Sequence, residues 1–249
     1  MSEAAVSAPP SMLIRYGNFL FRWRNTLFPV LMLALFVAFR PGFPGVDRWV
    51  ALAGLLIVFG GAALRWTVVG MEYIKRGGLQ KKVYADTLVT GGMFSHCRNP
   101  LYVGNLMILL GTFIFHGSPW VIAIGTVYFV HAYIAIVAAE ENFLRGKFGA
   151  QFDEYVASTP RWGIRLAGLG KTLEGYRFNW GRVVVKEYTT DATAALTVLA
   201  VVAWRVWSAG GAGVKDQMLM VGGAAVAVAV LTLLIRVMKK AGVLKEAEG

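Results

Sequence analysis

The chain has 249 residues, of which 57% are hydrophobic and 16% charged, with a formal net charge of +11 at pH 7. Ordinary soluble domains are about 45–50% apolar and about 25% charged, so the composition excludes a typical soluble enzyme. The positive charge lies in loops that flank apolar runs, where anionic lipid headgroups explain it better than a nucleic acid does. We therefore expect membrane lipids as partners and no nucleic acid.

The apolar runs predict an all-α, polytopic integral membrane protein with about six transmembrane helices. An amphiphilic segment over 12–23 is expected to lie as a short interfacial helix before the first span. Gly117-Ser-Pro is a very short turn, so the third and fourth spans are predicted to form a helical hairpin. Glycine and alanine dominate the last span, which suits close helix packing; the alternative is a lipid-facing helix with a face of small residues. The predicted spans are 25–39, 49–69, 101–116, 120–139, 192–207 and 217–237.

The basic residues predict the orientation. With six spans, 20 of the 25 lysine and arginine residues fall on one side of the membrane and four on the other, with Arg65 left uncounted. The positive-inside rule makes the first side cytoplasmic. We expect a bacterial inner-membrane protein with both termini in the cytoplasm. Three parts are predicted: an N-terminal tail and interfacial segment (1–24), a membrane core (25–162), and an amphiphilic segment with two further spans (163–249).

A polar stretch from Asp86 to Gly104 carries the most specific pattern in the chain. Gly91 and Gly92 permit a tight turn that lets the backbone approach a ligand. Pro100 is suited to the first turn of a helix, whose N-terminus favours an anionic group. Arg98 is expected to pair either with a ligand carboxylate or with a glutamate. A second specific stretch runs from Glu140 to Trp162, and the two are expected to meet and form a cofactor pocket at the cytoplasmic face.

A pair of glutamates, Glu140 and Glu141, follows the fourth apolar run. Carboxylates at the C-terminal end of a helix oppose its macrodipole, so a compensating group is expected. An amino group, a sulfonium or ribose hydroxyls of a ligand would provide it. The alternative is that a new helix begins here with acids in its first turn.

Five ordered elements together resemble the isoprenylcysteine carboxyl methyltransferase and phospholipid methyltransferase superfamily. These are integral membrane enzymes that use S-adenosyl-L-methionine. The resemblance covers residues 50–162 and leaves out the last two spans. The elements are Leu88-Val-Thr-x-Gly-x-Phe, Arg98-Asn-Pro-x-Tyr-x-Gly, Glu140-Glu-x-x-Leu, Phe148-Gly-x-x-Phe-x-x-Tyr and Pro160-Arg.

The resemblance implies transfer of a methyl group from S-adenosylmethionine to a lipophilic acceptor, such as an isoprenylcysteine carboxylate or a phospholipid amine. A homo-oligomer is left open, and no catalytic residue and no metal site are assigned. The residues that the resemblance and the pattern together nominate for the cofactor are Asp86, Thr87, Leu88, Val89, Phe94, Arg98, Asn99, Pro100, Leu101, Tyr102, Gly104, Glu140 and Glu141.

Three positions depart from the family pattern. Phe94 stands where a tyrosine is common, which removes a hydroxyl contact, and Asn99 stands where the isoprenylcysteine enzymes have histidine. Those enzymes also carry an arginine about one helical turn before the glutamate pair, where this chain has Ile136. A prenylated cysteine with a free carboxylate is therefore a doubtful acceptor.

Three residues are substrate candidates, each beside a structural alternative. His131 lies inside the fourth span, where an ionisable group is a functional hypothesis by default, although a histidine bonded to a neighbouring helix is the simpler interpretation. Arg161 and Trp162 either close the pocket over the cofactor or anchor the chain at the membrane surface. His96 is either a base in the loop or a packing residue.

Two other function classes compete with the methyltransferase. An NADPH-dependent sterol or steroid reductase shares the Arg-x-Pro-x-Tyr-x-Gly pattern, but many such enzymes follow the glycine with an acid, whereas Asn105 follows here. The other rival is a non-enzymatic membrane protein of the same fold. Intact Arg98, Pro100, Tyr102 and Glu140 favour an enzyme over it.

Overall fold

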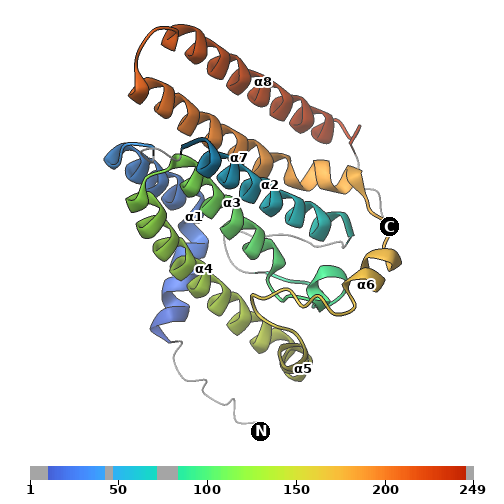
Figure 1. Cartoon of the computed structure of the whole chain (residues 1–249). Coiled ribbons are helices and arrows are strands. Elements are labelled where there is room, and N and C mark those ends of the chain that lie inside the picture. Colours follow the sequence, from blue (N-terminus) through green and yellow to red (C-terminus); the bar gives the residue numbers. More distant parts are fainter. Residues whose placement is uncertain (1–10, 43–46, 72–83, 245–249) are drawn as a thin grey trace.

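The computed structural model describes residues 11–42, 47–71 and 84–244, and within these ranges the chain is helical and contains no strand. The long helices lie against one another, with α8 at one edge (Figure 1). Residues 1–10 of the predicted tail and 43–46 of the predicted turn lie outside the described residues. The helices are α1 (Met12–Ala38), α2 (Asp47–Met71), the short 3-10 helix η2 (Gly92–Ser95), α3 (Pro100–His116), α4 (Pro119–Phe148), α5 (Ala150–Ser158), α6 (Leu169–Gly175), α7 (Trp180–Ala209) and α8 (Val214–Lys240).

Membrane-spanning length confirms the predicted class. Among the described residues, α1, α2, α4, α7 and α8 are long and apolar enough to cross a bilayer, and α3 is a shorter apolar helix of 17 residues. The predicted hairpin is present, since Gly117 ends α3 in the left-handed region with φ of 84° and α4 starts two residues later. The chain is a polytopic, all-helical membrane protein.

Two predicted boundaries are wrong. The segment 12–23 is the first half of one continuous helix, because Ser11 caps its start by accepting a hydrogen bond from the Ile14 amide and the helix continues through Pro29 to Ala38. Helix α7 begins at Trp180, well before residue 192, because the Asn179 side chain accepts a bond of 2.8 Å from the Arg182 amide and caps it there. Its polar first turns looked like loop in sequence because they carry charged groups.

The contact between α2 and α3 is made through glycines. A Cβ built on Gly111 would lie 2.5 Å from the Gly54 carbonyl oxygen, and one built on Gly61 would lie 2.6 Å from the Gly104 carbonyl oxygen. Small residues at these positions let the two backbones touch, the usual route to helix association in membranes. The helix that carries Tyr102 is thus held directly against α2.

Close packing through the small residues of the last span was a wrong prediction for contacts within this chain. A Cβ added at Gly222 or Gly223 would meet nothing within 4 Å, and no described residue of α8 is buried. α8 packs along one side of α7 (Figure 1). The packing glycines lie in α2 and α3 instead, where larger side chains surround them in the sequence.

We expect Gly111→Ala to lower the thermal unfolding midpoint of the detergent-solubilised protein, because overpacking a tight contact costs about 1–3 kcal/mol. Gly223→Ala is the matched control, and its midpoint is expected to stay unchanged or rise slightly because alanine favours helix. Differential scanning fluorimetry measures both variants. Equal midpoints for the two would contradict the glycine contact.

A buried ion pair ties α7 to the rest of the bundle. Arg65 of α2 and Glu187 of α7 are 5% and 0% exposed, and the Arg65 Nη2 atom lies 2.9 Å from Glu187 Oε2. The same guanidinium donates to the Leu101 carbonyl at 3.1 Å and to the Asn105 side chain at 2.6 Å. Trp66 adds a parallel link, donating to Asp191. Arg65 of α2 is therefore bonded both to α7 and to the first turns of α3, and links the three helices.

Candidate functional site

The predicted site residues, apart from His131, gather at one end of the bundle, which we call the site end. It contains the loop 84–99, the N-terminus of α3, the C-terminal half of α4 and the return segment, which we define as residues 159–176. The return segment leaves α5 and runs back across the loop before α7 begins (Figure 1). Helices α1 and α7 flank this end. The two stretches that the sequence analysis selected therefore meet, although about 40 residues separate them.

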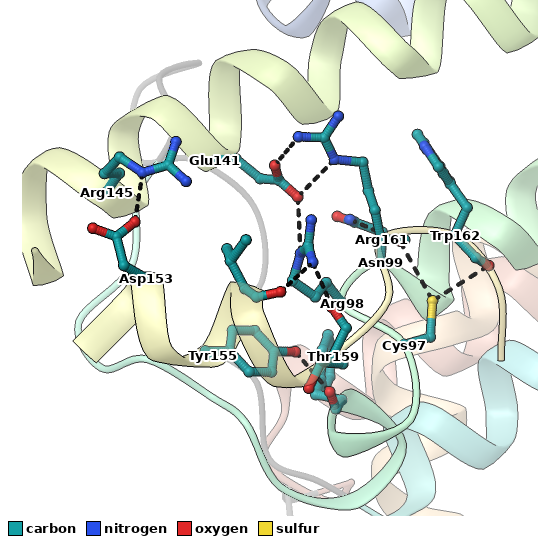
Figure 2. A network of polar contacts seen from close by, with 12 residues as sticks. Cys97, Arg98, Asn99, Glu141, Arg145, Asp153, Tyr155, Thr159, Arg161 and Trp162 are labelled. Atoms are coloured by element: carbon teal, nitrogen blue, oxygen red, sulfur yellow. Dashed lines mark hydrogen bonds and ion pairs between the residues drawn. The ribbon is translucent and has the colours of Figure 1, made fainter. Parts of the chain in front are cut away.

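Glu141 is enclosed by two arginines (Figure 2). Its side chain is 6% exposed; Arg98 donates to Oε1 at 3.1 Å and Arg161 donates to both carboxylate oxygens. The compensating charge expected for the glutamate pair thus comes, for Glu141, from the protein itself. A cofactor contact of Arg98 or Glu141 stays a prediction, but ion pairing within the chain already accounts for both residues.

Arg98 also fastens the return segment to the loop. Its guanidinium donates to the carbonyls of Val156, at 3.2 Å, and Thr159, and its backbone amide donates to the Pro160 carbonyl at 2.9 Å. The Asn99 side chain donates to the Arg161 carbonyl at 3.1 Å. These bonds satisfy carbonyls that would otherwise lack donors at the end of α5. The cluster therefore fixes where the return segment begins.

His96 fixes the other half of the return segment. Its Nδ1 lies 2.6 Å from the Arg165 carbonyl oxygen, so this nitrogen is the donor, and its Nε2 lies 2.9 Å from the Thr172 hydroxyl. The Arg165 amide donates back to the His96 carbonyl, and the Tyr176 hydroxyl accepts from the Gly92 amide at 2.8 Å. Both ring nitrogens of His96 are engaged, which favours its packing role over that of a base.

Tyr102 forms the second polar cluster at this end, between α1, α3 and α4. Its hydroxyl donates to Glu140 Oε1 at 2.7 Å and accepts from the Arg24 guanidinium at 3.1 Å. The Tyr133 ring lies beside it, with centroids 5.2 Å apart. Arg24, Tyr102 and Glu140 are each partly exposed. Unlike Glu141, Glu140 is not closed off by an ion pair within the described residues.

The first predicted cofactor residues line the outside of this end. Asp86 and Thr87 are exposed, and Asp86 accepts a hydrogen bond from the Tyr84 hydroxyl, while Leu88 and Val89 are half-buried. Phe94 packs beside the buried cluster Val68, Met71 and Met93 at the end of α2. Their cofactor contacts stay predictions.

The start of α3 has the geometry that the sequence predicted. Pro100 occupies the first turn, and the Asn99 side chain makes no cap hydrogen bond to the helix. The Leu101 carbonyl is held by Arg65, as described above. Gly104 is buried against Gly61 and the Arg65 side chain, so helix packing accounts for this glycine, and its contact with a cofactor stays a prediction.

An apolar cavity of about 340 Å³ lies between α3 and α4 and reaches Trp162. Trp162 is half-buried and packs against the main core cluster. The cavity is also lined by Val103 and Met107 of α3 and by Val130 and Ile134 of α4. His131 lies on the exposed side of α4, with its ring 5.9 Å from that of Tyr16. A substrate role for His131, Arg161 and Trp162 stays a prediction.

Sequence reasoning missed Arg24 and Arg65. Arg24 was counted only as a basic flank of the first span, and Arg65 was noted at the end of a span and given no role. An available signal was their position on helices otherwise rich in apolar residues, where a charged group needs a partner. The identity of those partners was not readable, because Arg24 is 78 residues from Tyr102 and Arg65 is 122 from Glu187.

The single cysteine, Cys97, provides a test of how closed the loop is. It is 0% exposed, and burial raises the pKa of its thiol above the usual value, against opposing effects of the Asn99 backbone and Arg98. Only the thiolate reacts with alkylating agents, so a raised pKa leaves less thiolate at a given pH. We expect slow modification of the folded protein by N-ethylmaleimide at pH 7, accelerating as the pH rises toward the raised pKa.

Mass spectrometry over time measures that rate. Thr90→Cys in a Cys97→Ser background is the matched control, since Thr90 is exposed in the same loop. Equal rates for the two cysteines at pH 7 would contradict a closed loop.

Comparison with known proteins supports the resemblance. A family model described as phospholipid methyltransferase matches residues 49–151. The chain is 32% identical over 178 residues to the cobalt-zinc-cadmium resistance protein CzcN of Cupriavidus metallidurans, covering 67% of this chain and 75% of that protein. It is 29% identical over 164 residues to the nickel-cobalt-cadmium resistance protein NccN of Alcaligenes xylosoxydans xylosoxydans, covering 66% and 73%. No solved structure matches the chain significantly.

Proposed function

Because the chain belongs to the phospholipid methyltransferase family, we propose that it transfers a methyl group from S-adenosylmethionine to a lipophilic acceptor at the site end. The observation that carries the proposal is the cluster of Arg24, Tyr102 and Glu140. It places a carboxylate, a phenol and a guanidinium, all partly exposed, where three helices meet. The family match supports the reaction class, and this cluster supports the proposed location of the site.

The residues at the site end suit an amphipathic, charged cofactor. Glu140 has one carboxylate oxygen, Oε2, that takes no hydrogen bond from the described residues, and so it can accept from an ammonium or a ribose hydroxyl. At the start of α3 the Leu101 amide has no acceptor among the described residues and so can donate to an anion, whereas the Tyr102 and Val103 amides donate to the carbonyl of Asn99. Leu88, Val89 and Phe94 supply apolar surface for a flat ring. S-adenosylmethionine, when bound, supplies a methyl group activated on a sulfonium sulfur.

The protein's own contribution is to hold both reactants in line and to exclude water. Positioning two reactants in this way removes much of the entropic part of a barrier. Two sets of contacts, those of Arg98 and of His96, fix the return segment over the loop and so cover the site. The apolar cavity at Trp162 is open to a lipid chain between α3 and α4. In this proposal the site end faces the cytoplasm and the acceptor enters laterally from the bilayer.

The names of the relatives refer to metal resistance. In the part of the chain that the structure describes, no group of three or more histidine, cysteine, aspartate or glutamate residues is placed to hold a metal ion. The names of the relatives therefore do not identify a methyl acceptor for this chain. The proposed acceptor remains a lipophilic molecule with a nucleophilic headgroup.

One observation bears on the reductase alternative. Asn105, which replaces the acid that many reductases carry, accepts a hydrogen bond of 2.6 Å from Arg65 and so belongs to the packing of α2, α3 and α7. A structural partner in that position favours the methyltransferase over a hydride-transfer enzyme. The non-enzymatic alternative would leave Glu140 and Arg24 without a ligand to bind.

Isothermal titration calorimetry on detergent-purified protein tests the proposed function. S-adenosylhomocysteine, the product of the cofactor, is expected to bind with micromolar affinity, and NADPH is expected not to bind. Binding of NADPH alone would move the protein to the reductases. If neither bound, the non-enzymatic alternative would replace the proposal.

A further inference from the structure

Arg24 has hydrogen-bonding capacity that the protein does not use. A guanidinium carries five N–H donors, and within the described residues Arg24 donates to the Tyr102 hydroxyl alone. Its guanidinium lies over the Phe21 ring, with Cζ 4.2 Å from the ring centroid. The residue is partly exposed, on the side of α1 that meets α3 and α4. The remaining donors form a preoriented binding edge for an anionic group, the kind of group that a guanidinium fork binds best.

The opposite charge lies on the other side of the same hydroxyl. Tyr102 accepts from Arg24 and donates to Glu140, so the phenol stands between a cation and an anion. No ion pair within 4.0 Å joins Arg24 to Glu140 among the described residues, whereas Glu141, the next residue, is closed by Arg98 and Arg161. One glutamate is thus neutralised by the protein, and the other is held apart from its nearest cation by a hydroxyl.

Such a pair of separated charges fits a ligand that is itself a zwitterion. A lone carboxylate or a lipid phosphate would be attracted by Arg24 but repelled by Glu140, and a lone amine would meet the reverse. A group with an ammonium and a carboxylate on one carbon satisfies both sides. Of the two partners expected for Arg98, a ligand carboxylate or a glutamate, the structure shows the glutamate. The guanidinium of Arg98 donates to Glu141 and to the carbonyls of Val156 and Thr159.

We propose that Arg24 and Glu140 form the subsite for the amino acid end of the cofactor, with Arg24 binding its carboxylate and Glu140 its ammonium group. This inference rests on the proposed function and extends it to helix α1, which lies outside the matched residues 49–151. Tyr102 keeps the two charges apart and aligned. The adenosine end is left to the loop 84–99.

Three ligands that differ only at the amino acid end test the subsite by calorimetry, without any turnover. S-adenosylhomocysteine carries both charges, 5′-(3-aminopropyl)thioadenosine carries the ammonium alone, and 5′-methylthioadenosine carries neither. For the wild-type protein the affinity is expected to fall in that order. Arg24→Gln is expected to weaken S-adenosylhomocysteine by about tenfold or more and to leave 5′-methylthioadenosine unchanged. The aminopropyl compound is expected to bind as before or somewhat more tightly, because the cation that repels its ammonium is gone.

Two further variants complete the design. Glu140→Gln is expected to bring the aminopropyl compound down to the level of 5′-methylthioadenosine. It is expected to weaken S-adenosylhomocysteine as well, which keeps only the contact of its carboxylate with Arg24. Arg22→Gln is the matched control, since Arg22 is an exposed arginine on the same helix with its guanidinium against the neighbouring Trp23 ring. It is expected to change none of the three affinities.

The subsite is overturned if Arg24→Gln leaves S-adenosylhomocysteine binding unchanged, or if it weakens all three ligands equally, as general loosening of α1 would. In either case wild-type binding of S-adenosylhomocysteine would keep the proposed function intact. If the wild-type protein bound none of the three ligands, the proposed function itself would fail, and the subsite with it.

Discussion

Glu140→Gln is expected to weaken S-adenosylhomocysteine binding while leaving the thermal unfolding midpoint of the protein nearly unchanged. The glutamine keeps the shape of the side chain and can still accept from the Tyr102 hydroxyl. What it loses is the charge offered to the ligand. A hydrogen bond to a charged group contributes about 1.5–3 kcal/mol, which corresponds to roughly a ten- to hundredfold loss of affinity.

The neighbouring Glu141→Gln is the matched control and is expected to show the opposite behaviour. Removing its charge leaves Arg98 without its counterion in a buried position, with a cost of about 1.5–3 kcal/mol. Arg161 contributes less to this cost because 44% of its side chain is exposed. The midpoint should fall, and the return segment should become easier to cleave by protease. Calorimetry measures the ligand affinity of both variants, and scanning fluorimetry measures their unfolding midpoints. If both variants lost ligand affinity and neither lost stability, the assignment of Glu140 to the ligand and of Glu141 to the fold would be contradicted.

Glu187→Leu is expected to destabilise the protein more than Gly111→Ala or Glu141→Gln. The carboxylate is fully buried, and its removal leaves the Arg65 guanidinium buried without a counterion. Breaking a buried pair from one side costs about 3–5 kcal/mol. The unfolding midpoint of the detergent-solubilised protein measures the loss.

The double variant Arg65→Leu with Glu187→Leu is expected to recover part of that stability, because replacing both ions by apolar groups is often close to neutral. Recovery is incomplete because the Leu101 carbonyl and the Asn105 side chain lose the hydrogen bonds from the guanidinium. Trp66→Phe is the control for the parallel link to α7, since it removes the hydrogen bonds to Asp191 and leaves the ion pair in place. It should cost about 1 kcal/mol. A single Glu187→Leu variant that unfolds at the wild-type midpoint would contradict a structural role for the ion pair.

The ion pair between Arg65 and Glu187 also gives α7, the first of the last two spans, a structural role. Sequence analysis placed them outside the resemblance and gave α7 no role. In the structure the first turns of α7 are bonded to Arg65, which in turn holds the Leu101 carbonyl next to Tyr102. The helix is thus part of the support for α3. The division of the chain at residue 162 stays a prediction, and so does the orientation of the termini.

Much of the site could be predicted because its pattern is local. Pro100 starts α3 and Gly117 ends it, for reasons that concern a few neighbouring residues and their allowed backbone angles. The apolar runs gave the helices, since a bilayer-spanning segment must satisfy its own backbone hydrogen bonds. The two stretches 86–104 and 140–162 were expected to meet, and they do.

By itself, then, the sequence determined the all-helical membrane class, the family and the loop that starts α3, because hydropathy and short-range turn chemistry are written in consecutive residues. Only the tertiary structure decided which charged group faces which. Arg98 forms an ion pair with Glu141, and Arg65 forms one with Glu187. Arg24 donates a hydrogen bond to the Tyr102 hydroxyl, which in turn donates to Glu140. The physical reason is that an ion pair depends on the distance between side chains from separate helices. Residues 78 or 122 positions apart in sequence carry no local sign of that distance.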